Sequence, residues 1–91
     1  MIKSFKHKGL KKFFYKGDTS GLNPNHIEKL KFILRRLNSA CIIQDMDVSG
    51  YRLHPYKNVP DLWSVDVSSN YRILFEFRDC DAYVVDYLDP H

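Results

Sequence analysis

The sequence has 91 residues, of which 44% are hydrophobic and 14% aromatic, a composition that predicts a packed core rather than a disordered chain. This length suits a single domain over residues 1–91 and excludes a second core. No apolar run is as long as a membrane span, and the first residues lack the apolar stretch of a signal peptide. We therefore expect a cytoplasmic protein with no membrane partner.

Charge is distributed unevenly, although the formal net charge is only +3. The first sixteen residues contain no acidic residue, but they contain Lys3, Lys6, Lys8, Lys11, Lys12 and Lys16. A cationic segment of this kind attracts phosphate groups or an acidic partner, and the attraction weakens with salt. A solvated helix face without a partner is the alternative, and charge alone does not choose between the two.

The two cysteines, Cys41 and Cys80, lie far apart in the sequence and form no closely spaced pair. Their spacing indicates neither a zinc site nor a disulfide framework. Because the cytoplasm is reducing, we expect two free thiols that are buried or partly buried.

The first half of the chain is predicted to be mainly helical. Leu10, Phe13 and Phe14 have helical spacing within residues 8–16, and Gly17 is a stop signal. A stronger apolar stripe extends a second helix to about Ala40, and it consists of Ile27, Leu30, Ile33, Leu34 and Leu37. Before it, the pattern indicates a short edge strand within residues 2–7, and after it a helical turn within residues 41–48.

Two caps are available for the second helix. Asn23 precedes Pro24, which suits the first helical position, whereas Asn25 followed by Glu28 resembles a capping box. The sequence leaves both alternatives open, and either of them starts the same helix.

After Gly50 the apolar period changes from helical to two, which predicts strands. The predicted strands are residues 62–68, 71–78 and 82–88. The Ser69-Asn70 step suits a tight hairpin between the first two of them. Helices followed by consecutive strands predict an α+β fold, with N-terminal helices packed on one face of a small, mainly antiparallel sheet.

The chain lacks the spacing of a metal site, a P-loop, a dinucleotide-binding glycine pattern and a GxSxG elbow. We therefore expect no cofactor and no metal. The remaining polar residues suit proton transfer at a phosphodiester, because they combine histidines, a carboxylate and fixed cations. These candidates are His54, His91, Asp89, Lys57 and Arg72.

Each candidate also has a structural interpretation. His54 beside Pro55 could be a structural or surface histidine. Arg72 could pair with Asp66 across the hairpin, a surface contact worth ~0.2–1 kcal/mol. His91, as the last residue, could be frayed.

Five segments in order resemble the HigB toxins of the RelE/ParE superfamily: MIKSFKHKGL, YRLHPYK, LWSV, NYRILFEF and DAYVVDYLDPH. The resemblance covers nearly the whole chain. It implies a RelE-like fold and a toxin of a type II toxin–antitoxin module. Such a toxin would be a metal-independent endoribonuclease that cleaves messenger RNA in the ribosomal A site, and its partner would be a HigA-like helix-turn-helix antitoxin.

By position, the resemblance implies catalytic roles for His54, Lys57, Arg72, Asp89 and His91. Asn70, Tyr71 and Tyr56 are the expected substrate-binding residues, and either tyrosine could equally be core. The cationic first helix could contact ribosomal RNA through Lys8, Lys11 and Lys12.

The chain also departs from this pattern. Pro90 stands where the relatives have tyrosine, and two basic positions of the relatives have no counterpart. A RelE-fold binding module with weak or no nuclease activity and a ParE-like gyrase inhibitor are therefore kept as alternatives. The residues do not assign which group is the acid and which the base.

Overall fold

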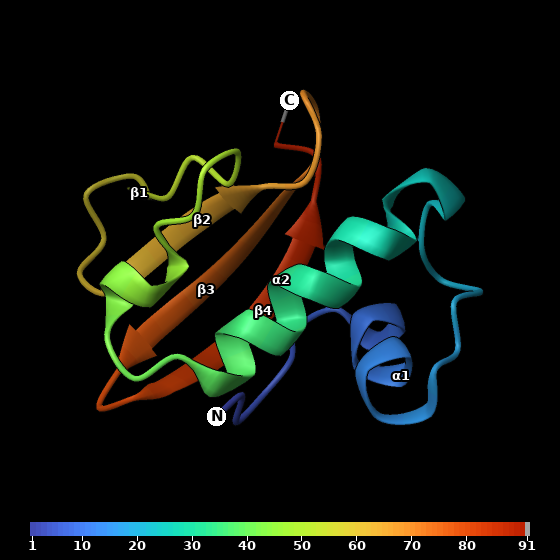
Figure 1. Ribbon diagram of the computed structural model, residues 1–91, viewed down its shortest axis with the longest axis horizontal. Helices are drawn as coiled ribbons and strands as arrows, with labels where there is room; N and C mark the ends of the chain where they lie inside the picture. Colours follow the sequence, from blue (N-terminus) through green and yellow to red (C-terminus); the bar gives the residue numbers. More distant parts are fainter. Residues whose placement is uncertain (91) are drawn as a thin grey trace.

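The computed structural model describes residues 1–90, and in this range two α-helices pack on one face of a four-stranded antiparallel sheet (Figure 1). This arrangement confirms the predicted α+β fold. His91, an expected catalytic residue, lies outside the described residues. None of the helices in this range is long and apolar enough to cross a membrane.

The strands are β1 His54–Pro55, β2 Leu62–Asp66, β3 Arg72–Arg78 and β4 Asp81–Leu88. They lie side by side in chain order, and each neighbouring pair is antiparallel. The N-terminal segment runs beside β4 through two parallel bridges, Ile2 to Ala82 and Phe5 to Val85. The expected edge strand is therefore present as isolated bridges.

Helix α1, Lys8–Lys16, has the predicted bounds. At its start, Nδ1 of His7 accepts the backbone N–H of Leu10 at 3.0 Å, which satisfies one of the otherwise unpaired donors of the first turn. At its end, Gly17 has φ 71°, a left-handed conformation that glycine adopts without steric cost, and its N–H bonds to the carbonyl of Phe13.

Helix α2, Ile27–Ser39, follows a short 3₁₀ helix, η1 Pro24–His26. Oδ1 of Asn23 accepts the N–H of Asn25 at 2.9 Å, with Pro24 at the first position of η1. Asn23 with Pro24 is therefore confirmed as the cap of η1, which leads directly into α2. The capping box at Asn25 is wrong, because α2 begins after His26 and has no side-chain cap. The expected helical turn is η2, Ile43–Met46.

The two faces of the sheet have different environments. On β3, Ile73, Phe75 and Phe77 are buried and face α2, whose buried residues are Leu30, Ile33, Leu34 and Leu37. Since successive strand residues point to opposite sides, Arg72, Leu74 and Glu76 project from the other side. We call this side, turned away from α2, the open face.

The expectation of free thiols is wrong, because Cys41 and Cys80 form a disulfide. Cys41 follows α2, and Cys80 lies in the turn between β3 and β4. The fold brings these two segments together at one end of the sheet, a proximity that a separation of 39 residues does not reveal. Neither cysteine is buried.

Candidate active site

The register of the sheet places several predicted site residues on the open face. His54 of β1 is paired with Ser64 of β2. Two residues further along β2, Asp66 is paired with Arg72 of β3, and Arg72 is in turn paired with Leu88 of β4. His54 and Arg72 therefore lie on the same face, on opposite sides of β2 and two residues apart in register.

The imidazole of His54 is held by two neighbours. Its Nδ1 lies 2.8 Å from the carbonyl oxygen of Arg52, and a carbonyl can only accept, so Nδ1 carries the proton. In the neutral ring Nε2 is then the proton acceptor. The hydroxyl of Ser64, which is fully buried, lies 3.1 Å from Nε2 and 3.5 Å from Nδ1.

These two distances show where the hydroxyl of Ser64 lies relative to the imidazole ring of His54. An oxygen on the lone-pair axis of Nε2 would be much further than 3.5 Å from Nδ1, because the two nitrogens lie across the ring. The hydroxyl of Ser64 therefore sits against the ring between the nitrogens, off that axis. It fixes the position of His54 without occupying the axis along which Nε2 would accept a proton from substrate.

The backbone around β1 is strained on both sides. Arg52 has φ 51°, and Lys57 and Asn58 have φ 51° and 55°. Each non-glycine residue in this left-handed region costs of order 1–3 kcal/mol and persists only where its surroundings hold it there. The conformation of Arg52 orients its carbonyl toward His54, so one of the strained residues positions a side chain of the predicted site.

Arg72 forms the ion pair with Asp66 that the structural interpretation expects. Its Nε lies 3.7 Å from one oxygen of Asp66, and Nε of Arg52 lies 3.6 Å from the other. Both distances exceed a hydrogen bond, and within residues 1–90 neither Nε of Arg72 nor Oδ1 of Asp66 has a hydrogen-bond partner. Two cations, Arg52 and Arg72, therefore flank the carboxylate of Asp66 at this end of the open face.

Two more predicted residues lie at the same end of the sheet. Asn70 is exposed in the turn that joins β2 and β3. Asp89 is exposed and follows Leu88, the partner of Arg72. The fold thus brings Asn70 and Arg72, which are two residues apart in the sequence, to the same end of the sheet as Asp89.

Tyr56 and Lys57 lie on the other side of His54. The backbone N–H of Tyr56 bonds to the carbonyl of Leu62, at the opposite end of β2 from Asp66. Nζ of Lys57 is 5.2 Å from the centre of the Tyr56 ring, a cation–π contact. Lys57 and Arg72 therefore lie toward opposite ends of β2.

Tyr71 packs on the helix side of the sheet. Its ring centre lies 5.0 Å from those of both His26 and Tyr87. In the same cluster the Tyr87 hydroxyl lies 2.6 Å from Nδ1 of His26, and burial raises the pKa of Tyr87. Tyr71 is thus a partly buried member of an aromatic cluster, and its role as a stacking surface stays a prediction.

A shallow hollow of about 410 Å³ continues the open face beyond this group. Leu62 and Leu74 line its middle, and Lys6, Glu76, Val84 and Asp86 complete the lining. Since Leu74 is paired with Ser64, the hollow lies directly beside the row that contains His54.

Sequence reasoning missed Ser64. The alternation of residues 62–68 placed Ser64 on the polar face, but the pairing that brings it to His54 was not readable, because β1 has only two residues. The carbonyl of Arg52 leaves no sequence signal either, since any residue supplies a carbonyl.

Comparison with known proteins decides the family. A family model for HigB-like toxins, described as RelE-like toxins of the type II toxin–antitoxin system HigB, matches residues 3–91. The chain belongs to this HigB-like toxin family. A relative from Proteus vulgaris, named Endoribonuclease HigB, is 42% identical over 92 residues and covers all of both chains. The resemblance inferred from the sequence is confirmed, and membership of a type II toxin family implies an antitoxin partner and an RNA substrate.

Proposed function

We propose that this HigB-like toxin is a ribosome-dependent, metal-independent endoribonuclease in which His54 transfers a proton. The observation that carries the proposal is the hydrogen bond from Nδ1 of His54 to the Arg52 carbonyl, which leaves Nε2 as the acceptor. The match to the toxin family and the endoribonuclease activity named for the Proteus vulgaris relative support the reaction class.

In the proposed reaction, the 2′-hydroxyl of the messenger RNA loses its proton, and its oxygen attacks the adjacent phosphorus. The bond from phosphorus to the 5′-oxygen breaks, and this oxygen takes up a proton. The products are a 2′,3′-cyclic phosphate and a 5′-hydroxyl. His54 exchanges one of the two protons at Nε2, with Asp89 and His91 as its partners in proton transfer.

The negative charge of the pentacoordinate phosphorus intermediate requires fixed cations. Arg72 is suited to this role because its side chain is 29% exposed, although its Nε is buried, and because the ion pair that holds it to Asp66 is long. Lys57 supplies a second cation from the opposite side of His54. Nucleotides on either side of the scissile bond extend toward Asn70 in one direction and Tyr56 in the other.

The proposed partners follow from the same reaction. The toxin acts in the cytoplasm on message in the ribosomal A site and is neutralised by a HigA-like helix-turn-helix antitoxin. Lys8, Lys11 and Lys12, which line one side of α1 together with Tyr15 and Lys16, contact ribosomal RNA. None of these five residues is acidic, so this side of α1 attracts phosphate.

The chemistry of the cut ends tests this mechanism. In a purified translation system the wild-type toxin should release fragments that end in a 2′,3′-cyclic phosphate and begin with a 5′-hydroxyl. Ribosomes need magnesium to stay assembled, so they are crosslinked before EDTA is added. EDTA should then not stop cleavage. Fragments with 3′-hydroxyl and 5′-phosphate ends would contradict attack by the 2′-hydroxyl.

A further inference from the structure

The aromatic cluster on the helix side of the sheet lies directly behind the end of the sheet that carries Arg72. It consists of Tyr71, Tyr87 and His26, and the centres of the three rings are 5.0 to 5.9 Å apart. Tyr87 is 6% exposed and His26 is 8% exposed, so their polar atoms are largely removed from water.

The cluster joins three elements. Tyr71 directly precedes β3, Tyr87 lies near the end of β4, and His26 directly precedes α2. Nδ1 of His26 and the hydroxyl of Tyr87 are 2.6 Å apart and share a hydrogen bond, which the phenol donates to a neutral Nδ1 or accepts from Nδ1–H. The start of α2 is thus bonded to the end of β4, across 61 residues of sequence.

Packing alone does not require this hydrogen bond. A buried polar group costs free energy when it lacks a partner, and apolar side chains of similar size would fill the same space without that cost. A hydrogen bond adds a preferred direction, which apolar contacts lack. The bond between His26 and Tyr87 therefore fixes how the start of α2 and the end of β4 lie relative to each other.

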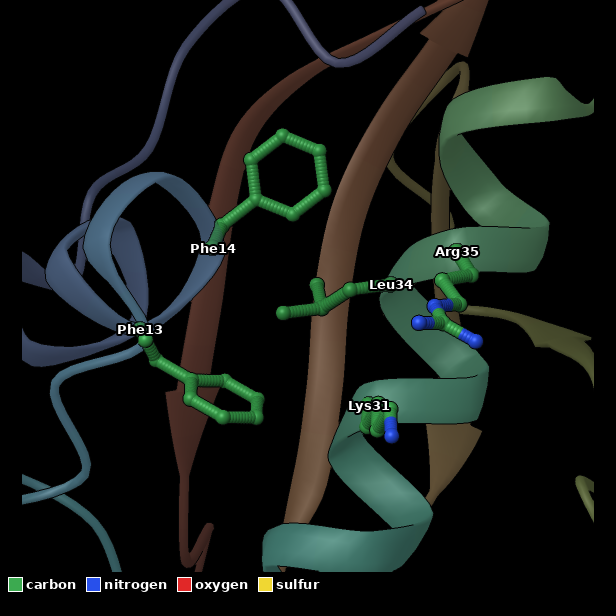
Figure 2. Close-up of a pocket in the computed structure, with 6 residues that line it drawn as sticks. Phe13, Phe14, Lys31, Leu34 and Arg35 are labelled. Atoms are coloured by element: carbon green, nitrogen blue, oxygen red, sulfur yellow. The ribbon is translucent and has the colours of Figure 1, made fainter.

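The helices contact each other differently away from the cluster. Figure 2 shows Phe13 and Phe14 projecting from α1 toward α2, and Leu34 pointing into the space between them. This space is a hollow of about 320 Å³. Apolar side chains beside a hollow do not fix the direction of α2 as the hydrogen bond at His26 does.

The tyrosines of the cluster are sequence neighbours of the candidate site. Arg72 follows Tyr71 and projects from the open face, because successive strand residues point to opposite sides. On the next strand, Leu88 follows Tyr87 and is paired with Arg72, and Asp89 comes after it. A shift of either tyrosine would therefore move Arg72 or Asp89.

Arg72 depends on this support because its own contacts are long. Its Nε is buried, has no hydrogen-bond partner among residues 1–90, and lies 3.7 Å from Oδ1 of Asp66. An ion pair of this length does not fix the direction of the guanidinium. The backbone at the start of β3 then determines where the guanidinium reaches.

We propose that His26 and Tyr87 are positioning residues for RNA cleavage, which hold Arg72 and Asp89 in place from behind the sheet; the inference rests on the proposed function. Both residues are buried, so they act through the strands and not by contact with RNA. Arg72 is proposed to stabilise charge that develops during the reaction. Loosening the cluster should therefore slow cleavage of bound message more than it weakens binding.

Cleavage kinetics on ribosome-bound message test the proposal. Tyr87→Phe removes only the hydroxyl, so kcat should fall about 10-fold while KM stays within about twofold of wild type. His26→Asn keeps a hydrogen-bonding group near the position of Nδ1 and should retain most of kcat, whereas His26→Leu should lose as much as Tyr87→Phe. Phe13→Leu, in the hollow of Figure 2, is the structural control, which should lower Tm and leave kcat unchanged.

Equal kcat values for wild type and Tyr87→Phe would overturn the proposal, and so would equal losses in His26→Asn and His26→Leu. NMR of the toxin without RNA gives a second test that needs neither a His26 variant nor cleavage. The Nε–H signal of Arg72 should shift or broaden in Tyr87→Phe, while the amide signal of Lys57 stays in place. An unchanged Arg72 signal would overturn the proposal. A wild-type toxin that left message uncut would refute the proposed function, and the Arg72 signal would still show whether the cluster holds Arg72.

Discussion

At the scale of single residues, Ser64 is the side chain that positions His54. Removing its hydroxyl by Ser64→Ala takes away a contact worth about 0.5–1.5 kcal/mol, so cleavage should fall roughly 2- to 10-fold. The ring should keep the Nδ1–H tautomer by ¹⁵N NMR, because the carbonyl of Arg52 and not Ser64 fixes it. Ser49→Ala, at an exposed serine, is the matched control. An unchanged cleavage rate in Ser64→Ala would remove the positioning role.

Asp45 provides a residue-scale prediction for pH. Its carboxylate accepts the backbone N–H groups of Cys41 and Ile42 at 2.9 and 3.2 Å, and these bonds lower its pKa below the ordinary value of 3.8. The folded state then binds this proton less readily than the unfolded state. The stabilisation is present above about pH 3.8 and is lost as pH falls through the lower folded value.

We therefore expect Asp45→Asn to be less stable than wild type at pH 7 and to approach it in acid. Urea unfolding of both proteins at pH 7, 4 and 2.5 measures the difference. A gap between the two proteins that stayed constant down to pH 2.5 would show that the charge of Asp45 contributes nothing.

At the scale of elements, the disulfide between Cys41 and Cys80 clamps the end of α2 to the turn between β3 and β4. Closing a loop of this length stabilises a protein by about 2–4 kcal/mol in the chain-entropy account. The double variant Cys41→Ser/Cys80→Ser should lose about that much free energy of unfolding relative to the oxidised wild type. Reduced wild type should match the double variant, and equal stability of oxidised and reduced protein would contradict the clamp.

The elements themselves were predictable where a local pattern determined them. The stripe from Ile27 to Leu37 indicated α2, and the alternation around Ile73 and Phe75 indicated β3, because burial of one face sets both periods. β1 was not predictable, since a two-residue strand that contains Pro55 has no period. The disulfide and the contact of Ser64 with His54 depend on long-range pairing, which a local pattern does not encode.

At the scale of the whole molecule, two surfaces are distinct: the open face with His54 and the lysine-lined side of α1. The proposed site residues come from β1 and the loop after it, the β2–β3 turn, the start of β3 and the segment after β4, so only the fold brings them together. The family resemblance identified most of them, but their arrangement around β2 required the register of the sheet.

The lysine-lined side of α1 gives a whole-molecule prediction. Each lysine that neutralises a phosphate contributes about one unit to the slope of log affinity against log salt. Changing Lys8, Lys11 and Lys12 to glutamine should therefore flatten the salt dependence of ribosome binding by about three units. Lys3→Gln, measured in the same filter-binding series, should leave the slope unchanged. An equal slope for the triple variant and wild type would show that these lysines do not face ribosomal RNA.

The most direct measurement of the central claim is primer-extension mapping of a message in cell-free translation, with wild-type toxin and with His54→Ala. Folding of the variant is checked by circular dichroism, and a parallel reaction without ribosomes tests free RNA. The proposed function predicts cuts within codons on translated message alone, and their loss in His54→Ala. Equal cutting by the two proteins would contradict the role of His54, and an uncut message with wild type would contradict the nuclease itself.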